Sequence, residues 1–356
     1  MKRLVLGIVI GALLMAAAFW GIPFSDFLAA LGRLNPGGLL VFTALFGVQL
    51  VLQALRQQVL LAELTPGMSL RSSFALIVVG SFSVQTLPVR LGEFVRPWML
   101  HRDEGVPAGA GLGVIAIERA MDLVALLVTL AAVLLWVELP SRTLDLMGTK
   151  IDIVSWGWST ARMLIPSIAL AVVVLAVIGP GIVAALRPFF GRIAARLGVR
   201  GPAERLFDFA AHFAESFRAL RHPGRMVAAL GLSGLIWAEI SLMYYALAHA
   251  FGLSDQVHFG EAAGVMTITA LGSLLPAPPA MAGVQEAFGR GSLALFGVHG
   301  PDFDAVALGY AVVAHWWQYL LITVGTLAVA SWQGLRLRDV LAGTRATMPA
   351  EPPGTP

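Results

Sequence analysis

The 356-residue sequence contains no cysteine and few charged residues, which make up 13% of the chain against about 25% in a soluble domain. Without cysteine there is no disulfide, no thiolate metal site and no cysteine nucleophile. The seven histidines never form a His-x-x-x-His or Glu-x-x-His pair, and the chain has neither a Gly-x-Ser-x-Gly nucleophile turn nor a nucleotide-binding glycine loop. We therefore expect no metal, no cofactor and no catalytic residue of these types.

Apolar residues are abundant, at 58% of the chain with a mean hydropathy of +0.80. Several apolar runs approach the ~20 residues that a helix needs to cross a bilayer. The predicted fold class is all-α: a polytopic integral membrane protein with about six full spans plus two re-entrant helical hairpins in an inverted-topology repeat. The full spans are expected near residues 4–20, 39–55, 108–139, 163–186, 226–251 and 305–332. For the first, a cleaved signal peptide is the alternative to the retained helix that we favour.

The segment 72–100 interrupts this pattern of spans. It begins as an apolar run, gathers serine, glutamine and threonine, breaks at Pro88, and then presents Arg90, Glu93 and Arg96. If a helix restarts at Pro88, these three charges share one face and can pair. Polar, broken backbone at membrane depth persists only where protein buries it or where it lines a water-filled cavity. We predict a re-entrant hairpin here, with an ordinary cytoplasmic loop as the alternative.

A second broken segment, 262–297, matches the first. Leu87-Pro88 followed by Gly92-Glu93-Phe94 has a counterpart in Leu275-Pro276 followed by Gly283, Glu286 and Phe288. Each segment lies between two full spans, and an odd number of crossings joins the two units, so they are expected to be inverted repeats. The predicted divisions are 1–36 (first transmembrane helix and loop), 37–139 (repeat 1), 140–224 (linking span and basic amphipathic cytoplasmic segment), 225–333 (repeat 2) and 334–356 (disordered cytoplasmic tail).

Arginine distribution predicts the topology. Eight arginines lie in the segment 187–225, and positive charge marks the cytoplasmic side of a membrane. A multi-pass protein of the cell (inner) membrane with both termini cytoplasmic satisfies this rule. Within the segment, residues 204–220 form a basic amphipathic helix that lies either among anionic lipid headgroups or against the protein's own underside. The segment lacks a fold or aromatic platform for nucleic acid, so no nucleic-acid partner is expected.

Charged residues inside spans are costly, which makes them functional candidates. Arginine forks match phosphate oxygens, so Arg90, Arg96 and Arg119 are expected to hold a phosphate while nearby carboxylates orient them. A self-neutralising cluster that locks helix 108–139 to the first hairpin is the structural alternative. The predicted substrate-binding set is Arg90, Glu93, Arg96, Glu118, Arg119, Asp122 and Glu286, and the secondary candidates are Gln85, Arg290, His315, Gln318 and Tyr319. A helix–helix seam is favoured for the last three, and Glu239 is a further candidate for which helix packing is as good an explanation.

Three motifs resemble a known family. They are Leu-Pro-x-Arg-x-Gly-Glu-x-x-Arg at 87–96, Glu-Arg-x-x-Asp at 118–122 and Gly-x-x-Glu at 283–286. They are similar to the flippase-like transmembrane domain of lysylphosphatidylglycerol synthases, over about residues 4–333. In the bifunctional synthases this domain moves aminoacylated phosphatidylglycerol across the membrane and a separate soluble domain makes it. The resemblance implies a stand-alone translocating half, and the proline-rich stretch 276–283 departs from the glycine-rich form, which leaves the substrate open.

These observations predict a membrane lipid translocator whose polar cavity lies between the two hairpins. Movement would be downhill or coupled to an ion, because the chain has no nucleotide site. The expected partners are membrane lipids, above all anionic phospholipid, with a lipid-synthesis enzyme and a second copy of the chain (a homo-oligomer) as open alternatives. Two other functions stay open: an intramembrane transferase with Glu118 or Asp122 as base, and a non-transport partner of a lipid-synthesis complex.

Overall fold

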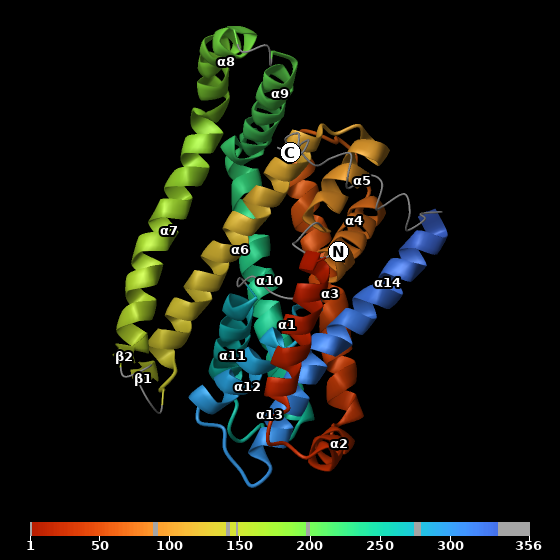
Figure 1. Ribbon diagram of the computed structural model, residues 1–356, viewed down its shortest axis with the longest axis vertical. Coiled ribbons are helices and arrows are strands. Elements are labelled where there is room, and N and C mark those ends of the chain that lie inside the picture. Colours follow the sequence, from red (N-terminus) through yellow and green to blue (C-terminus); the bar gives the residue numbers. More distant parts are fainter. Residues whose placement is uncertain are drawn as a thin grey trace.

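The computed structural model describes residues 2–87, 92–139, 143–146, 149–196, 200–273 and 279–333, and these are almost entirely helical (Figure 1). After α1 (Lys2–Ala18) and α2 (Phe24–Gly32), a first unit comprises α3 (Pro36–Leu61), α4 (Leu70–Thr86), α5 (Val95–Glu104) and α6 (Ala108–Trp136). A second unit comprises α10 (Pro223–Ala250), α11 (Phe259–Gly272), the 3-10 turn η3 (Pro279–Met281), α12 (Val284–Leu295), α13 (Phe303–Val312), the π-helical turn η4 (Val313–Trp317) and α14 (Gln318–Gln333).

Four of the described helices are long and apolar enough to cross a membrane: α3, α6, α10 and the continuous run Phe303–Gln333. Only 17% to 33% of their apolar windows is buried inside the protein, as expected of helices that face lipid. The chain is therefore a helical multi-pass membrane protein.

The two units contain helices in the same order, which is long, medium, short and long. The long helices α3 and α10 lie antiparallel, because Gly38 contacts Ala250 near one end and Arg56 bonds to Ser233 near the other. The closing helices exchange partners: α14 packs against α4, and α6 packs against α11. Each unit thus completes its core with a helix of the other.

In each unit a break separates the medium helix from the short one, α4 from α5 and α11 from α12. In the first, Pro88 and Arg90 lie outside the described residues, and Gly92 returns against α4 so closely that a Cβ atom there would lie 2.1 Å from the Ser83 carbonyl. In the second, Pro276 lies outside the described residues. Ala280, Met281 and Gly283 follow with positive φ angles of 57°, 53° and 81°. Glycine tolerates this backbone, whereas the two non-glycine residues are strained.

The linking region departs from its prediction. No span was predicted between residues 139 and 163, and the strands β1 (Thr143–Leu146) and β2 (Thr149–Asp152) pair antiparallel there. The helix α7 runs from Ile153 to Val177, so it begins ten residues before the span predicted at 163–186. Asp152 explains the early start, because its Oδ1 accepts hydrogen bonds from the Val154 and Ser155 N–H groups at 3.0 and 3.1 Å.

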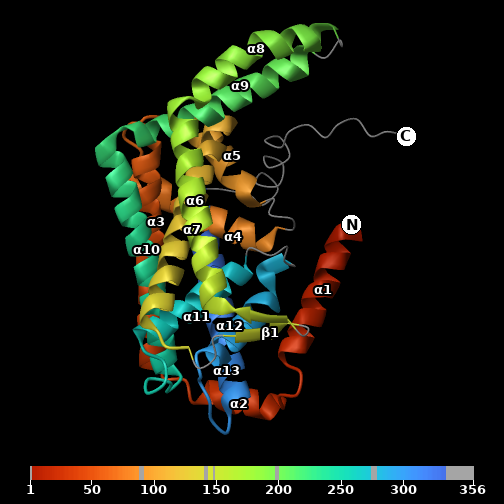
Figure 2. The ribbon, with the colours of Figure 1, turned by 90° about the vertical axis from the view of Figure 1, so that its left-hand side faces the viewer.

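The basic segment forms α8 (Gly179–Arg196), α9 (Arg200–Ser216) and the turn η2 (Phe217–Arg221). Figure 2 shows α8 and α9 extending beyond the bundle, at the end opposite α2. The predicted amphipathic helix 204–220 packs on the protein along only part of its length. Its last part packs on the protein, where Phe217 is buried and Gly113 of α6 admits Ser216, while Leu206 is 65% exposed.

Candidate functional site

A buried ion pair joins α5 to α6. Arg96 donates from Nη1 to Glu118 Oε2 at 2.7 Å and from Nη2 to Glu118 Oε1 at 3.0 Å, and its Nη2 also donates to Gln57 Oε1 at 2.9 Å. The two charged side chains are 8% and 1% exposed. Gly80 of α4 makes room for the arginine stem, since a Cβ atom there would lie 2.3 Å from Arg96 Cγ. An ion pair that joins the segment 72–100 to helix 108–139, as in the structural alternative of the sequence analysis, is therefore present, and it is bidentate.

A second buried pair lies beside it and contains a residue that sequence reasoning missed. Arg56 of α3, with a side chain 3% exposed, donates to Asp122 Oδ1 at 2.5 Å and to Ser233 Oγ at 3.0 Å. Trp237 Nε1 also points at Asp122 Oδ1, at 3.4 Å. The predicted span 39–55 stops just before Arg56, whereas α3 continues to Leu61. The apolar residues Val59, Leu60 and Leu61 after it were the available signal.

Arg119 lies outside these buried pairs. Its side chain is 60% exposed, and its Nη1 lies 3.7 Å from Asp122 Oδ2, which is an ion-pair contact without a hydrogen bond. Of the other predicted residues, Arg90 lies outside the described residues and Glu93 is half-buried. Gln85 bonds only weakly, from Nε2 to the Ser81 carbonyl of its own helix at 3.5 Å.

The second unit contains a matching buried centre around Glu286. Its Oε1 accepts from Trp316 Nε1 at 2.7 Å and lies 2.8 Å from His315 Nδ1, and its Oε2 accepts from the Gly283 N–H at 2.7 Å. Consecutive residues of an α-helix point about 100° apart. The π-helical turn lets His315 and Trp316 both reach one carboxylate, and such turns often mark functional sites. His315 Nε2 is buried and has no hydrogen-bond partner in the described structure.

The remaining secondary candidates have structural contacts. Tyr319 forms a helix–helix seam, with its hydroxyl 3.1 Å from Thr86 Oγ1 and its ring stacked on Phe82. Gln318 donates to the Ala314 carbonyl of its own helix. Arg290 donates to the Ala18 carbonyl at 3.1 Å and to Asp304 at 2.6 Å, which ties α12 to α1 and α13.

The two buried centres occupy corresponding places. Arg96 is the second residue of α5, and Glu286 is the third of α12. Each reaches the middle part of its unit's closing helix, at Glu118 in α6 and at His315 in the run 303–333. The basic and acidic side chains are exchanged between the units. The first has its basic side chain on the short helix and its acidic one on the closing helix, and the second has the reverse arrangement.

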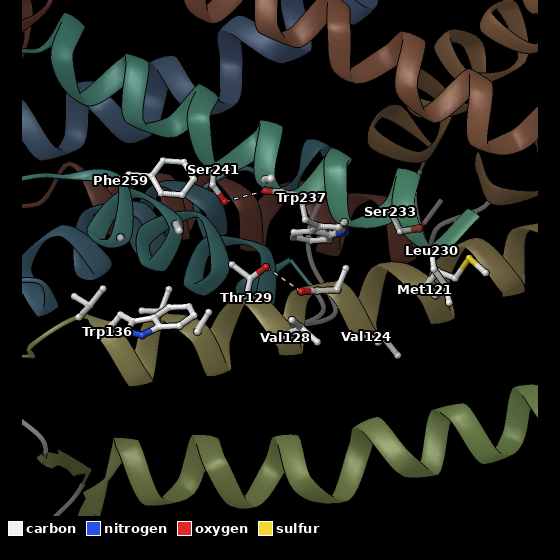
Figure 3. A pocket seen from close by; sticks show the side chains of 18 residues that line it. Met121, Val124, Val128, Thr129, Trp136, Leu230, Ser233, Trp237, Ser241 and Phe259 are labelled. Carbon is white, nitrogen blue, oxygen red and sulfur yellow. Dashed lines mark hydrogen bonds between the residues drawn. The ribbon is translucent and has the colours of Figure 1, made fainter. Parts of the chain in front are cut away.

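An apolar groove of about 450 Å³ runs between α6, α10 and α11 (Figure 3). Its exposed lining includes Val128, Trp136, Leu230 and Phe259, so it is open along one side. Ser233 and Trp237 line the groove, and each also forms a hydrogen bond with the ion pair, Ser233 with Arg56 and Trp237 with Asp122. The groove and the buried charges therefore adjoin.

The four charges of the two ion pairs described above, Arg56, Arg96, Glu118 and Asp122, balance. Arg119 adds a fifth whose fork has donors left over. Among the described residues, no group of three or more histidines and acids is placed to hold a metal ion. The exposed guanidinium of Arg119 suits a phosphate anion, because a guanidinium matches phosphate oxygens, and the groove, whose lining does not include Arg119, suits an apolar chain.

Residues 4–325 of the chain match the family described as the lysylphosphatidylglycerol synthase TM region. No curated protein and no solved structure gives a significant match.

Proposed function

Since the chain belongs to the lysylphosphatidylglycerol synthase TM region family, we propose that it is a lipid translocator, which moves a phospholipid or another polar-headgroup lipid between leaflets. The observation behind the proposal is the junction of a polar network with an open apolar groove at Ser233 and Trp237. A lipid has the same division, with a charged headgroup joined to apolar chains.

Arg119 is the proposed entry point for the headgroup phosphate. Arg56 and Arg96 are held by carboxylates, whereas Arg119 is largely exposed and, among the described residues, has only the 3.7 Å contact to Asp122. A guanidinium exposed within an apolar helix is costly unless it reaches the interface or meets an anion. An anionic phospholipid supplies that anion, and one acyl chain would lie in the groove.

The broken segments are proposed to be re-entrant hairpins of an inverted repeat, with both termini cytoplasmic. The antiparallel contact of α3 with α10, the exchanged packing of α4 with α14 and of α6 with α11, and the matched centres at Arg96 and Glu286 support this proposal. Transporters commonly place their substrate site where such broken helices meet near the midplane.

The test uses proteoliposomes containing phosphatidylglycerol with a fluorophore on its headgroup and a membrane-impermeant bleaching reagent. Wild-type protein is expected to expose inner-leaflet lipid to the reagent, unlike protein-free vesicles. Arg119→Lys keeps the charge but would lose one of the two hydrogen bonds to phosphate. Because one hydrogen bond to a charged group corresponds to about a factor of ten, we expect this variant to translocate lipid about tenfold more slowly than wild type. Arg218→Lys, an exposed arginine of η2 paired with Glu215, is the matched control.

Because Arg119 is exposed, its replacement leaves the buried pairs intact, and expression should match that of the control. A wild-type rate for Arg119→Lys would refute the phosphate role. Mass spectrometry of the recovered lipid distinguishes the transferase alternative, since a translocator returns the lipid unchanged.

A further inference from the structure

Glu239 is a buried acid in the middle of α10. It is 7% exposed, and neither carboxylate oxygen has a hydrogen-bond partner in the described structure. Sixteen residues separate it from Pro223 and eleven from Ala250 (239 − 223 and 250 − 239), or roughly 24 and 16 Å at the rise of an α-helix. A hydrocarbon core about 30 Å thick places it well away from both interfaces.

Gln49 lies at the same level of the neighbouring helix α3. In the direction of the Gly38–Ala250 contact, Gln49 is eleven residues from Gly38 and Glu239 is eleven from Ala250 (49 − 38 and 250 − 239). In the other direction, Gln49 is seven residues from Arg56 and Glu239 is six from Ser233, which are bonded to each other (56 − 49 and 239 − 233). Gln49 Oε1 is likewise buried without a partner. Three acceptor atoms on two packed helices therefore lack a donor.

The ionisable groups of the elements packed on α10 have other partners or places. On α3, Arg56 bonds to Asp122, and on α11, Glu261 caps the helix at His258. On α6, Glu118 pairs with Arg96, and Asp122 contacts Arg56 and Arg119. The turn η2 carries Arg221 and also Arg218, which pairs with Glu215. On α10 itself, Arg225 pairs with Glu63, His249 contacts Tyr245, and the Tyr244 carbonyl accepts from the Tyr310 hydroxyl. None of these forms a recorded ion pair or hydrogen bond with Glu239.

A carboxylate buried without a donor is strongly disfavoured, whereas a neutral carboxyl brings its own O–H donor. That donor would satisfy an acceptor such as Gln49 Oε1. The described surroundings of Glu239 therefore accommodate the protonated acid.

We propose that Glu239 is a proton-binding site, and that the gain and loss of one proton there couples lipid movement to a proton gradient. The coupling rests on the proposed translocation, whereas proton binding does not. Trp237, Ala238 and Ser241, on the same two turns of α10, line the groove, whereas Glu239 itself is not among its lining residues. Loss of the proton leaves a buried charge that is stabilised only if α10 shifts so that water reaches Glu239, so deprotonation and a rearrangement of the groove wall favour each other.

The first experiment measures proton binding without transport. Unfolding of the detergent-solubilised full chain is followed from about pH 5 to about pH 8, above the ~4.3 of an unfolded glutamate. The folded chain retains a proton that the unfolded chain loses, so stability falls as pH rises, by up to tenfold in the unfolding constant per pH unit. Glu239→Gln should remove this component of the slope, and Glu138→Gln, an exposed acid, should keep it. Equal slopes in wild type and Glu239→Gln would overturn the site.

The second experiment measures coupling with the headgroup-labelled phosphatidylglycerol in proteoliposomes. The measured quantity is the ratio of translocation rates with and without an imposed pH gradient. Wild type and Glu138→Gln should give a ratio different from one, and Glu239→Gln a ratio of one. A ratio of one in translocating wild type, or an unchanged ratio in Glu239→Gln, overturns the coupling. Absence of wild-type translocation refutes the proposed function instead, and the first experiment still decides proton binding.

Discussion

Replacing either partner of the Arg96–Glu118 pair alone should lower the free energy of unfolding more than replacing both together. Arg96→Met leaves the Glu118 carboxylate, 1% exposed, without its guanidinium, and Glu118→Leu leaves the arginine fork with Gln57 alone. An uncompensated buried charge costs about 3–5 kcal/mol, and apolar replacement of a whole buried pair is often near neutral. The double variant loses mainly the bond to Gln57, which is about 1–3 kcal/mol. The coupling energy of the cycle is therefore at least about 3 kcal/mol.

The assay is unfolding of the purified protein in mixed micelles of increasing denaturing detergent, followed by the fluorescence of its nine tryptophans. The matched control is the exposed pair Arg187–Glu204, whose nearest atoms are 2.6 Å apart and whose side chains are 43% and 36% exposed. Hydrogen bonding to Glu204 and the charge of Asp208 hold the pKa of Arg187 above its usual value. Water nevertheless screens the pair, so the coupling energy of its cycle should be much smaller than that of the Arg96–Glu118 cycle.

Additive effects of Arg96→Met and Glu118→Leu would refute the reasoning, because additivity means that neither residue depends on the other. A coupling energy no larger than that of the Arg187–Glu204 cycle would do the same, since burial would then add nothing to the interaction.

Three further results are expected. Gly80→Ala should destabilise the protein by about 1–3 kcal/mol in the same unfolding assay, because its Cβ would collide with the Arg96 stem, whereas Gly47→Ala has open space and should be neutral or stabilising. His315→Ala removes a partner of the buried Glu286 and should slow lipid translocation about tenfold, against a near-normal rate for Ser331→Ala, whose hydroxyl bonds only within its own helix. In the naturally cysteine-free chain, Ser254→Cys should react with an impermeant thiol reagent in intact cells and Gly201→Cys only after permeabilisation, and the opposite result contradicts the cytoplasmic placement of α8 and α9.

The sequence predicted the features that depend on local pattern. Apolar run length located the long helices, and polar residues with prolines located the breaks after α4 and α11. Because a charged side chain within a membrane span is energetically unfavourable, the sequence analysis singled out Arg96, Glu118, Asp122 and Glu286. In the structure each of them makes a buried or largely buried polar contact. These features follow from bilayer thickness and from the price of an unpaired charge, which act at the level of a single segment.

Features that depend on packing between distant segments were not predictable from one sequence. Asp122 is 66 residues from Arg56, and Ser233 is 177 residues from it. Glu118, Arg119 and Asp122 lie within one turn or so of α6, and the neighbours of that helix decide which side chains are buried. Arg56, and not the sequence neighbour Arg119, therefore makes the hydrogen-bonded ion pair with Asp122. The β1–β2 ribbon was hidden for another reason, because two four-residue strands give too short an alternation to distinguish from a loop.

The helix α1 has a consequence for the order in which the molecule is built. It lies at the edge of the bundle (Figure 2), where its Leu14 and Met15 cover Gly283 and its Ala18 carbonyl accepts from Arg290, 272 residues later. Ribosomes add about 5–20 residues per second, so roughly 14–54 s pass between the synthesis of the two partners. During that time α1 has lipid, or the insertion machinery, as its neighbour. The helix α1 is thus docked on the second unit only after α12 has been made, long after its own synthesis.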